Sequence, residues 1–239
     1  MIFTSPTAAE LLANVPDFCD WATAQAWIEV GQAGLYQIPH DCAFACLDGT
    51  QIDRSATLAD RSASCFGLYA SAEWRKFAMA TFLADLLSYR HPVDQVSFDR
   101  LLFVIHAFSE GFRVWWVKFS EIWWPVGYSG WYPMLEGHFE LFQKQPHLLK
   151  NRMVVPAPTS RDYLYFFNYS VMPSLKKSDL SKALMRHFVQ DIQQLFPKGM
   201  ACITVSEEGA QIATRFGMQC TGQLIIDGCA EGVWVANCK

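Results

Sequence analysis

Apolar residues follow two different periods along this chain, and the change between them divides it. Over residues 73–89 they recur every three or four positions, which predicts an amphipathic helix. A second helix is expected over 98–108 and an alanine-rich one over 20–30, while residues 47–65 are small and polar and indicate a loop. We therefore expect residues 1–105 to form a mostly helical N-terminal region.

Strand patterns begin near residue 111. Residues 111–119 and 122–132 are rich in aromatic and β-branched side chains, and Ser120-Glu121 between them predicts a hairpin turn. Further strands are expected over 162–171, 200–205, 219–226 and 232–236, and further helices over 136–143, over 179–196 and from a cap at Ser206. Strands that alternate with helices and end in a hairpin predict a mixed α/β sheet.

Composition narrows the class of protein. With 239 residues, of which 51% are hydrophobic and 18% charged, the chain can bury a substantial core in one large domain or two small ones. A net charge of −4 argues against nucleic acid as a partner of the whole protein. The longest run without a charged residue, 122–135, is too short to span a membrane as a helix and is broken by glycine and proline. No secretion signal is evident, so we expect a cytoplasmic protein with no membrane partner.

The eight cysteines are scattered along the chain. In a protein without a secretion signal they are expected to be reduced and mostly buried. Cys42 and Cys46 follow His40 closely, but no second pair of ligands accompanies them, so we expect no metal site.

Candidate chemistry concentrates where the strand over 162–171 ends. A short basic turn over 172–178 follows it, and a helix is expected to begin at Asp179. The first amides of a helix have no partners within the helix and its dipole favours negative charge, so this junction predicts an anion site. As the alternative, Lys176 and Lys177 are only solvated and Asp179 is only the helix N-cap.

Two segments resemble the GNAT superfamily of acyl-CoA-dependent N-acetyltransferases. They are Tyr169-Ser-Val-Met-Pro173, which leads into that helix, and Ala213-Thr-Arg-Phe-Gly-Met218. The resemblance covers residues 112–237 and implies a mixed, mostly antiparallel central sheet flanked by helices. It places an acyl-CoA-binding domain over 106–239, either separate from the N-terminal region or compact with it.

The resemblance also implies a cofactor site. In that family a loop after a valine-x-proline turn wraps the CoA pyrophosphate, and the pantetheine lies between two strands that splay apart. Carried onto this sequence, the CoA contacts fall on Ser170, Val171, Met172, Lys176, Lys177, Ser178, Asp179, Leu180 and Ser181.

Two positions depart from the family pattern. Asp179 stands where the family has its first loop glycine, and it adds a Cβ and a negative charge where backbone must approach phosphate. Ala213 stands where many members carry a tyrosine that acts as general acid.

The function that the resemblance implies is direct acyl transfer, to an amine, from acetyl-CoA or another acyl-CoA as co-substrate. Glu121, Tyr128 and His138 lie near the expected acceptor side and are the candidate bases, each with a structural role as its alternative. A non-catalytic module that binds acyl-CoA or a protein partner is the alternative function. The acceptor stays open among amino acid, peptide, polyamine and protein lysine, and so does a homodimer.

Overall fold

A computed structural model describes residues 1–16, 26, 28–29, 38, 42–52, 72–89, 94–149, 154–157, 160–226 and 228–238. Most of the helix expected over 20–30 and of the loop expected over 47–65 lies outside these residues.

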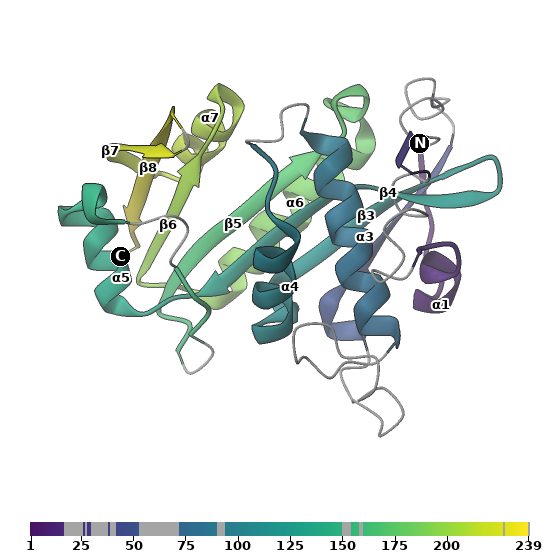
Figure 1. The fold of residues 1–239 in the computed structure, drawn as a ribbon, viewed down its shortest axis with the longest axis horizontal. Coiled ribbons are helices and arrows are strands. Elements are labelled where there is room, and N and C mark those ends of the chain that lie inside the picture. The colour runs from purple at the N-terminus through teal and green to yellow at the C-terminus, as the bar shows by residue number, and fades with distance from the viewer. Residues whose placement is uncertain are drawn as a thin grey trace. The chain divides into compact units, whose positions relative to one another are not determined.

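Among the described residues, eight strands form one sheet in the order β1-β2-β3-β4-β5-β6-β8-β7 (Figure 1). The strands are β1 (Ile2–Phe3), β2 (Ala43–Asp48), β3 (Phe112–Phe119), β4 (Ile122–Pro133), β5 (Tyr163–Val171), β6 (Gly199–Thr204), β7 (Gln219–Ile226) and β8 (Cys229–Asn237). The pairs β1–β2 and β5–β6 are parallel, whereas β2–β3, β6–β8 and β7–β8 are antiparallel. The predicted mixed, mostly antiparallel sheet is confirmed.

Helices occupy the connections between strands. They are α1 (Ala8–Leu12), α3 (Ala72–Ser88), α4 (Phe98–Ala107), α5 (Glu136–Lys144), α6 (Asp179–Leu195) and α7 (Glu207–Arg215). Short 3₁₀ turns occur at η1 (Gly49–Gln51), η4 (Ser109–Gly111), η5 (Pro146–Leu148) and η6 (Pro173–Leu175). The helices expected over 73–89, 98–108, 136–143 and 179–196 are confirmed, as is the Ser206 cap, whose hydroxyl accepts a hydrogen bond from the Gly209 amide at 3.1 Å.

The N-terminal region contributes strands that the sequence pattern did not predict. β2 reads AFACLD, a short apolar run that fits a buried strand as well as a helix. It pairs with β3 from Phe44 opposite Val117 to Asp48 opposite Arg113, and the Arg113 guanidinium forms an ion pair with Asp48. The boundary expected near residue 105 does not coincide with the division of the chain into compact units.

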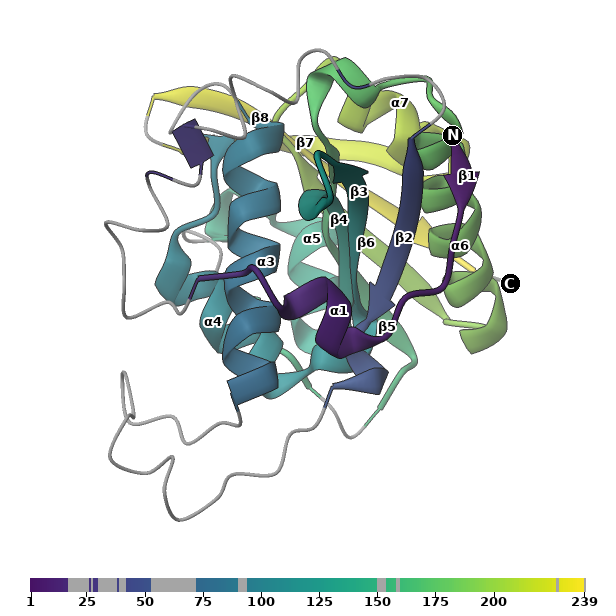
Figure 2. The same cartoon turned by 90° about the vertical axis from the view of Figure 1, so that its right-hand side faces the viewer.

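The first of two compact units comprises Met1–Ser129 and Ser170–Arg186. Within it α3 and α4 pack together and cover one face of β3 and its neighbouring strands (Figure 2). Large side chains of these elements are fully or almost fully buried, among them Trp74, Phe77, Leu83, Ile105, Phe112, Trp115 and Trp116.

The second unit comprises Gly130–Tyr169 and His187–Lys239. Its strand β6 lies between two helices. A Cβ on Gly199 would lie 2.4 Å from the Phe139 ring of α5, while the Cys202 sulfur lies 3.5 Å from that of Met218, which follows α7. Because alternate residues of a strand point to opposite faces, α5 and α7 cover opposite faces of this strand.

Strands β5 and β6 diverge inside this second unit. Their parallel pairing runs from Tyr163 opposite Gly199 to Phe166 opposite Cys202 and then stops. Within this unit β5 continues past Phe166, and residues 167–169 have no partner in β6. This is the divergence of neighbouring strands that the resemblance implies.

The described cysteines are less buried than expected. Cys202 is buried, and burial raises the pKa of its thiol to about 12. Cys220 and Cys229 are exposed, and the other three described cysteines are half-buried, so the prediction of mostly buried thiols is wrong for them. Cys220 and Cys229 lie on the terminal hairpin of β7 and β8, where one face of the strand meets solvent. None of the described helices is long and apolar enough to cross a membrane.

The end of α6 provides a test of local backbone strain. Phe196 follows the last helical residue with a φ of +47°, and it is 88% exposed. Glycine is preferred at such a position because a Cβ there is strained. We expect Phe196→Gly to raise the free energy of unfolding, measured by urea denaturation, by about 0.5–1 kcal/mol.

The matched control is Gln193→Gly, an exposed position inside the same helix, which should lower the free energy of unfolding by about 1 kcal/mol. A loss of stability in Phe196→Gly would show that the ring makes contacts that outweigh the strain.

Candidate functional site

The end of β5 is held closely against β4 in the first unit. The Met172 amide donates to the Val126 carbonyl at 2.7 Å. A Cβ on Gly127 would lie 2.7 Å from the Ser170 carbonyl oxygen and 3.2 Å from Val171 Cγ2. Only a glycine fits here, so Gly127 permits the close approach that positions everything after β5.

A tight turn follows at the basic residues. The Ser178 amide donates to the Leu175 carbonyl at 3.2 Å, with Lys176 at φ −56°, ψ 137° and Lys177 at φ +67°. These values are typical of a type II turn, whose third residue is usually glycine. A lysine held in a conformation that favours glycine stores strain, and such strain is concentrated at functional positions. Lys177 is therefore a functional candidate on backbone geometry as well as on charge.

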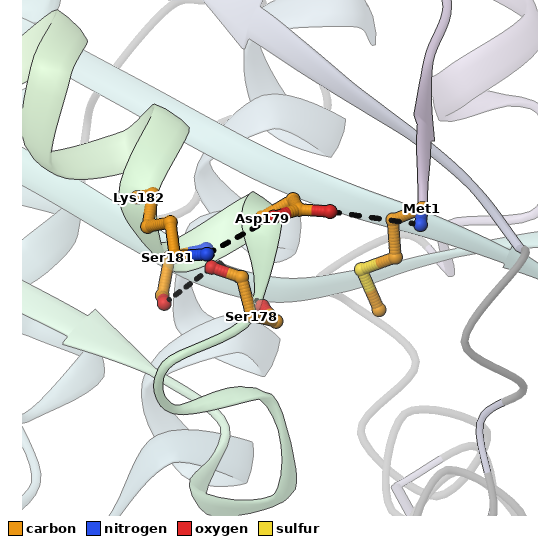
Figure 3. A network of polar contacts seen from close by, with 5 residues as sticks. All are labelled: Met1, Ser178, Asp179, Ser181 and Lys182. Atoms are coloured by element: carbon orange, nitrogen blue, oxygen red, sulfur yellow. Dashed lines mark hydrogen bonds and ion pairs between the residues drawn. The ribbon is translucent and has the colours of Figure 1, made fainter.

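The first turn of α6 is capped by Ser178. Its hydroxyl accepts a hydrogen bond from the Ser181 amide at 3.2 Å, and its carbonyl accepts one from the Lys182 amide at 3.1 Å. The Ser181 hydroxyl donates back to that carbonyl at 2.9 Å (Figure 3). The alternative in which Asp179 is the N-cap is therefore wrong, because the cap lies one residue earlier.

Asp179 occupies the first helical position instead, with its carboxylate 60% exposed. One of its oxygens lies 3.2 Å from the Lys182 ammonium and the other 3.9 Å from the Met1 nitrogen (Figure 3). Two cationic groups thus face the carboxylate that departs from the family pattern, and they offset part of its repulsion toward an anion.

A hollow of about 370 Å³ opens at this turn. It is lined by Met1, Ile38 and residues 174–179. Lys177 and Asp179 are exposed, and no hydrogen bond among the described residues uses their backbone amides. Two unused amides at a helix start and two lysines can bind an anion.

The other predicted cofactor residues lie beside the hollow rather than in its wall. Ser170, Val171 and Met172 are buried at the strand end, and Leu180 is fully buried in α6. Ser181 is held by the helix cap.

Tyr128 is buried and its hydroxyl is already engaged. It donates to Asp85 Oδ1 at 2.8 Å, and Asp85 Oδ2 accepts from the Val96 amide at 2.8 Å. Asp85 is fully buried in α3 and joins that helix to β4 and to the segment before α4. The sequence interpretation missed it, although a lone carboxylate at a core position of an apolar helix was a usable signal.

The other two candidate bases lie elsewhere. Glu121 sits in the β3–β4 turn with φ +64°, and its side chain is 90% exposed. A hydrogen bond from the Lys118 ammonium lowers the pKa of Glu121, which makes its carboxylate a weaker base. His138 lies in the first turn of α5, in the second unit, and its buried Nδ1 has no partner among the described residues. The three catalytic candidates remain predictions.

Comparison with known proteins finds solved structures that are similar to this chain at low sequence identity. The loading GNATL domain of CurA from Lyngbya majuscula has a TM-score of 0.48 and 12% identity over 67% of this chain and 92% of its own. A GphF GNAT-like decarboxylase in complex with isobutyryl-CoA has a TM-score of 0.46 and 11% identity, over 67% of this chain and 94% of its own. A putative GNAT-family acetyltransferase from Desulfovibrio desulfuricans has a TM-score of 0.43 and 12% identity, over 82% of this chain and 99% of its own. No protein-family model and no curated protein matches the sequence. These similarities concern the fold alone.

The cap assignment is testable by stability. Ser178→Ala removes the acceptor of the Ser181 amide and should lower the free energy of unfolding by about 1 kcal/mol. Asp179→Ala loses only an exposed charge near the helix start and should cost about 0.3–0.5 kcal/mol. Urea denaturation of both variants measures the difference. A larger loss of unfolding free energy for Asp179→Ala would show that Asp179 is the N-cap.

Proposed function

We propose that this protein is an acyl-CoA-dependent N-acyltransferase that binds the CoA pyrophosphate at the turn between β5 and α6. The hollow with its two unused amides and two lysines is the observation that carries the proposal. A pyrophosphate needs several donors and positive charge in one place, and this turn supplies both. The GNAT-like order of strands and helices is the setting in which the resemblance expects such a site.

The reaction asks mainly for positioning. A thioester carbonyl is already activated, so an amine nitrogen attacks its carbon, the C–N bond forms and the C–S bond breaks. CoA leaves as a thiolate, and the amine nitrogen gives up a proton to the base. Holding the two reactants together and stabilising charge on the carbonyl oxygen supply most of the acceleration.

Residues take the following roles in the proposal. Ser170, Val171 and Met172 lie along the pantetheine and acyl group, with a backbone amide near Val171 polarising the carbonyl. Lys176 and Lys177 contact the pyrophosphate together with the amides of the turn, while Ser178, Leu180 and Ser181 hold the helix start in place. Tyr128, His138 and Glu121 are the candidate bases, although the Tyr128 hydroxyl donates to Asp85 and Lys118 lowers the pKa of Glu121. We infer acetyl-CoA as donor, an amine as acceptor and the cytoplasm as location.

A non-catalytic acyl-CoA-binding module is the second candidate. It is favoured by Ala213, which is 2% exposed on α7 and offers no hydroxyl where many family members carry a general acid. The test incubates the protein with acetyl-CoA and with amino acids, peptides or polyamines as acceptors. CoA binding without release of the free CoA thiol would favour the module, whereas release with any one acceptor would favour the enzyme.

Acetyl-CoA should stabilise the protein against heat. A ligand present at 100 times its dissociation constant adds about 2.7 kcal/mol to the free energy of unfolding, because it binds the folded state alone. Differential scanning calorimetry with acetyl-CoA measures the rise in Tm. An unchanged Tm at millimolar acetyl-CoA, with the sample folded, would contradict the cofactor assignment.

Lys177→Gly should separate strain from function. It relieves a positive φ, so we expect the free protein to gain about 0.5–1 kcal/mol of stability. It also removes a cation from the hollow, so we expect CoA binding, measured by calorimetry, to weaken about two- to fivefold at low salt and less at high salt.

Phe196→Gly is the matched control, since it relieves the same kind of strain far from the turn in sequence. It should leave CoA affinity unchanged. Equal CoA affinities for Lys177→Gly and wild type would show that this lysine is only solvated.

A further inference from the structure

One buried hydroxyl on β5 has no hydrogen-bond partner among the described residues. Ser170 is 6% exposed, and its buried Oγ makes no hydrogen bond to any described residue. A hydroxyl taken out of water without a partner destabilises the fold, and native proteins rarely keep one without a reason. Alanine at this position would avoid the free-energy cost of burying an unpaired hydroxyl. The serine hydroxyl is therefore a candidate to bind a ligand.

The strand geometry shows which way this hydroxyl faces. Val171 Cγ2 lies against Gly127, so these two positions share one face of the β4–β5 pair. By alternation, Ser170 shares the other face with Tyr128. The Tyr128 hydroxyl on that face is engaged by Asp85 at 2.8 Å. Of the Tyr128 and Ser170 hydroxyls, that of Ser170 is therefore the one left for a ligand.

Its place along the chain fits the middle of a CoA site. Ser170 lies four residues beyond Phe166, the last residue of β5 that pairs with β6. It lies four residues before Ser174, the first residue of the turn that lines the hollow. Four residues of chain span at most about 14 Å, a length that a pantetheine arm can follow.

We propose that the Ser170 hydroxyl donates a hydrogen bond to the acyl carbonyl oxygen of bound acyl-CoA. The inference rests on the proposed function. A neutral, buried donor suits a neutral carbonyl oxygen, whereas phosphate is served by the lysines and amides of the turn.

The bond strengthens as the reaction proceeds. When the amine nitrogen attacks, the carbonyl electrons move onto this oxygen, and a donor already in place stabilises the charge. The C–S bond then breaks, the electron pair leaves with the CoA sulfur, and the carbonyl reforms. Ser170 keeps its proton throughout.

The test compares acetyl-CoA with free CoA, which has the same pantetheine but no acyl oxygen. Calorimetry on wild type and Ser170→Ala should show acetyl-CoA bound about three- to tenfold more weakly by the variant and CoA bound equally well. Ser109→Ala is the matched control, a buried serine whose Oγ donates to the Gly49 carbonyl at 3.4 Å. It should change neither affinity.

The melting temperature of the free proteins gives a second readout. Ser170→Ala should keep or raise the Tm, because it removes a polar group without a partner, while Ser109→Ala should lower it. An equal loss for both ligands would place the contact on the shared pantetheine and overturn the inference, as would unchanged affinity for acetyl-CoA or a Tm that falls as in Ser109→Ala. Wild type that binds neither ligand would instead reject the proposed function itself.

Discussion

The candidate site depends on how the end of β5 is held beyond its last residue paired with β6. Pairing with β6 ends at Phe166, so the end of β5 is held from the side of β4. Gly127 lets the two backbones approach, and the Met172 amide closes the contact on Val126 at 2.7 Å. A side chain at Gly127 would push the strand end away, and the turn and the start of α6 would move with it. One missing Cβ thus sets the position of every group proposed to contact CoA.

Two opposed tendencies meet in the turn after β5. The Ser178 cap and the hydrogen bond to Leu175 fix the backbone, which stabilises a defined helix start. Lys177 is held at a positive φ and two backbone amides are left unused, which stabilises nothing in the free protein. A turn selected for stability alone would carry glycine there. Rigid anchors around a strained, under-bonded centre are what a preorganised anion site requires.

The sequence predicted the elements whose periodicity is long and regular. α3, α4 and the β3–β4 hairpin follow from apolar spacing and the turn residues between them. β2 was missed because six residues of mostly apolar character fit either a helix or a strand, and its pairing with β3 is a long-range contact. The cap was assigned to Asp179 because serine and aspartate cap equally well, and only the backbone decides between them. The Tyr128–Asp85 contact joins residues 43 positions apart, which spacing along the chain cannot show.

The central claim is that the turn between β5 and α6 binds the CoA pyrophosphate. An NMR titration of the ¹⁵N-labelled protein with CoA tests it most directly, because it reports on individual backbone amides. We predict saturable changes in the chemical shifts of the Lys177 and Asp179 amide signals. The amide signal of Gly137, on α5 of the second unit, should not shift. Saturable shifts elsewhere in the protein, with the Lys177 and Asp179 amides unmoved, would contradict it.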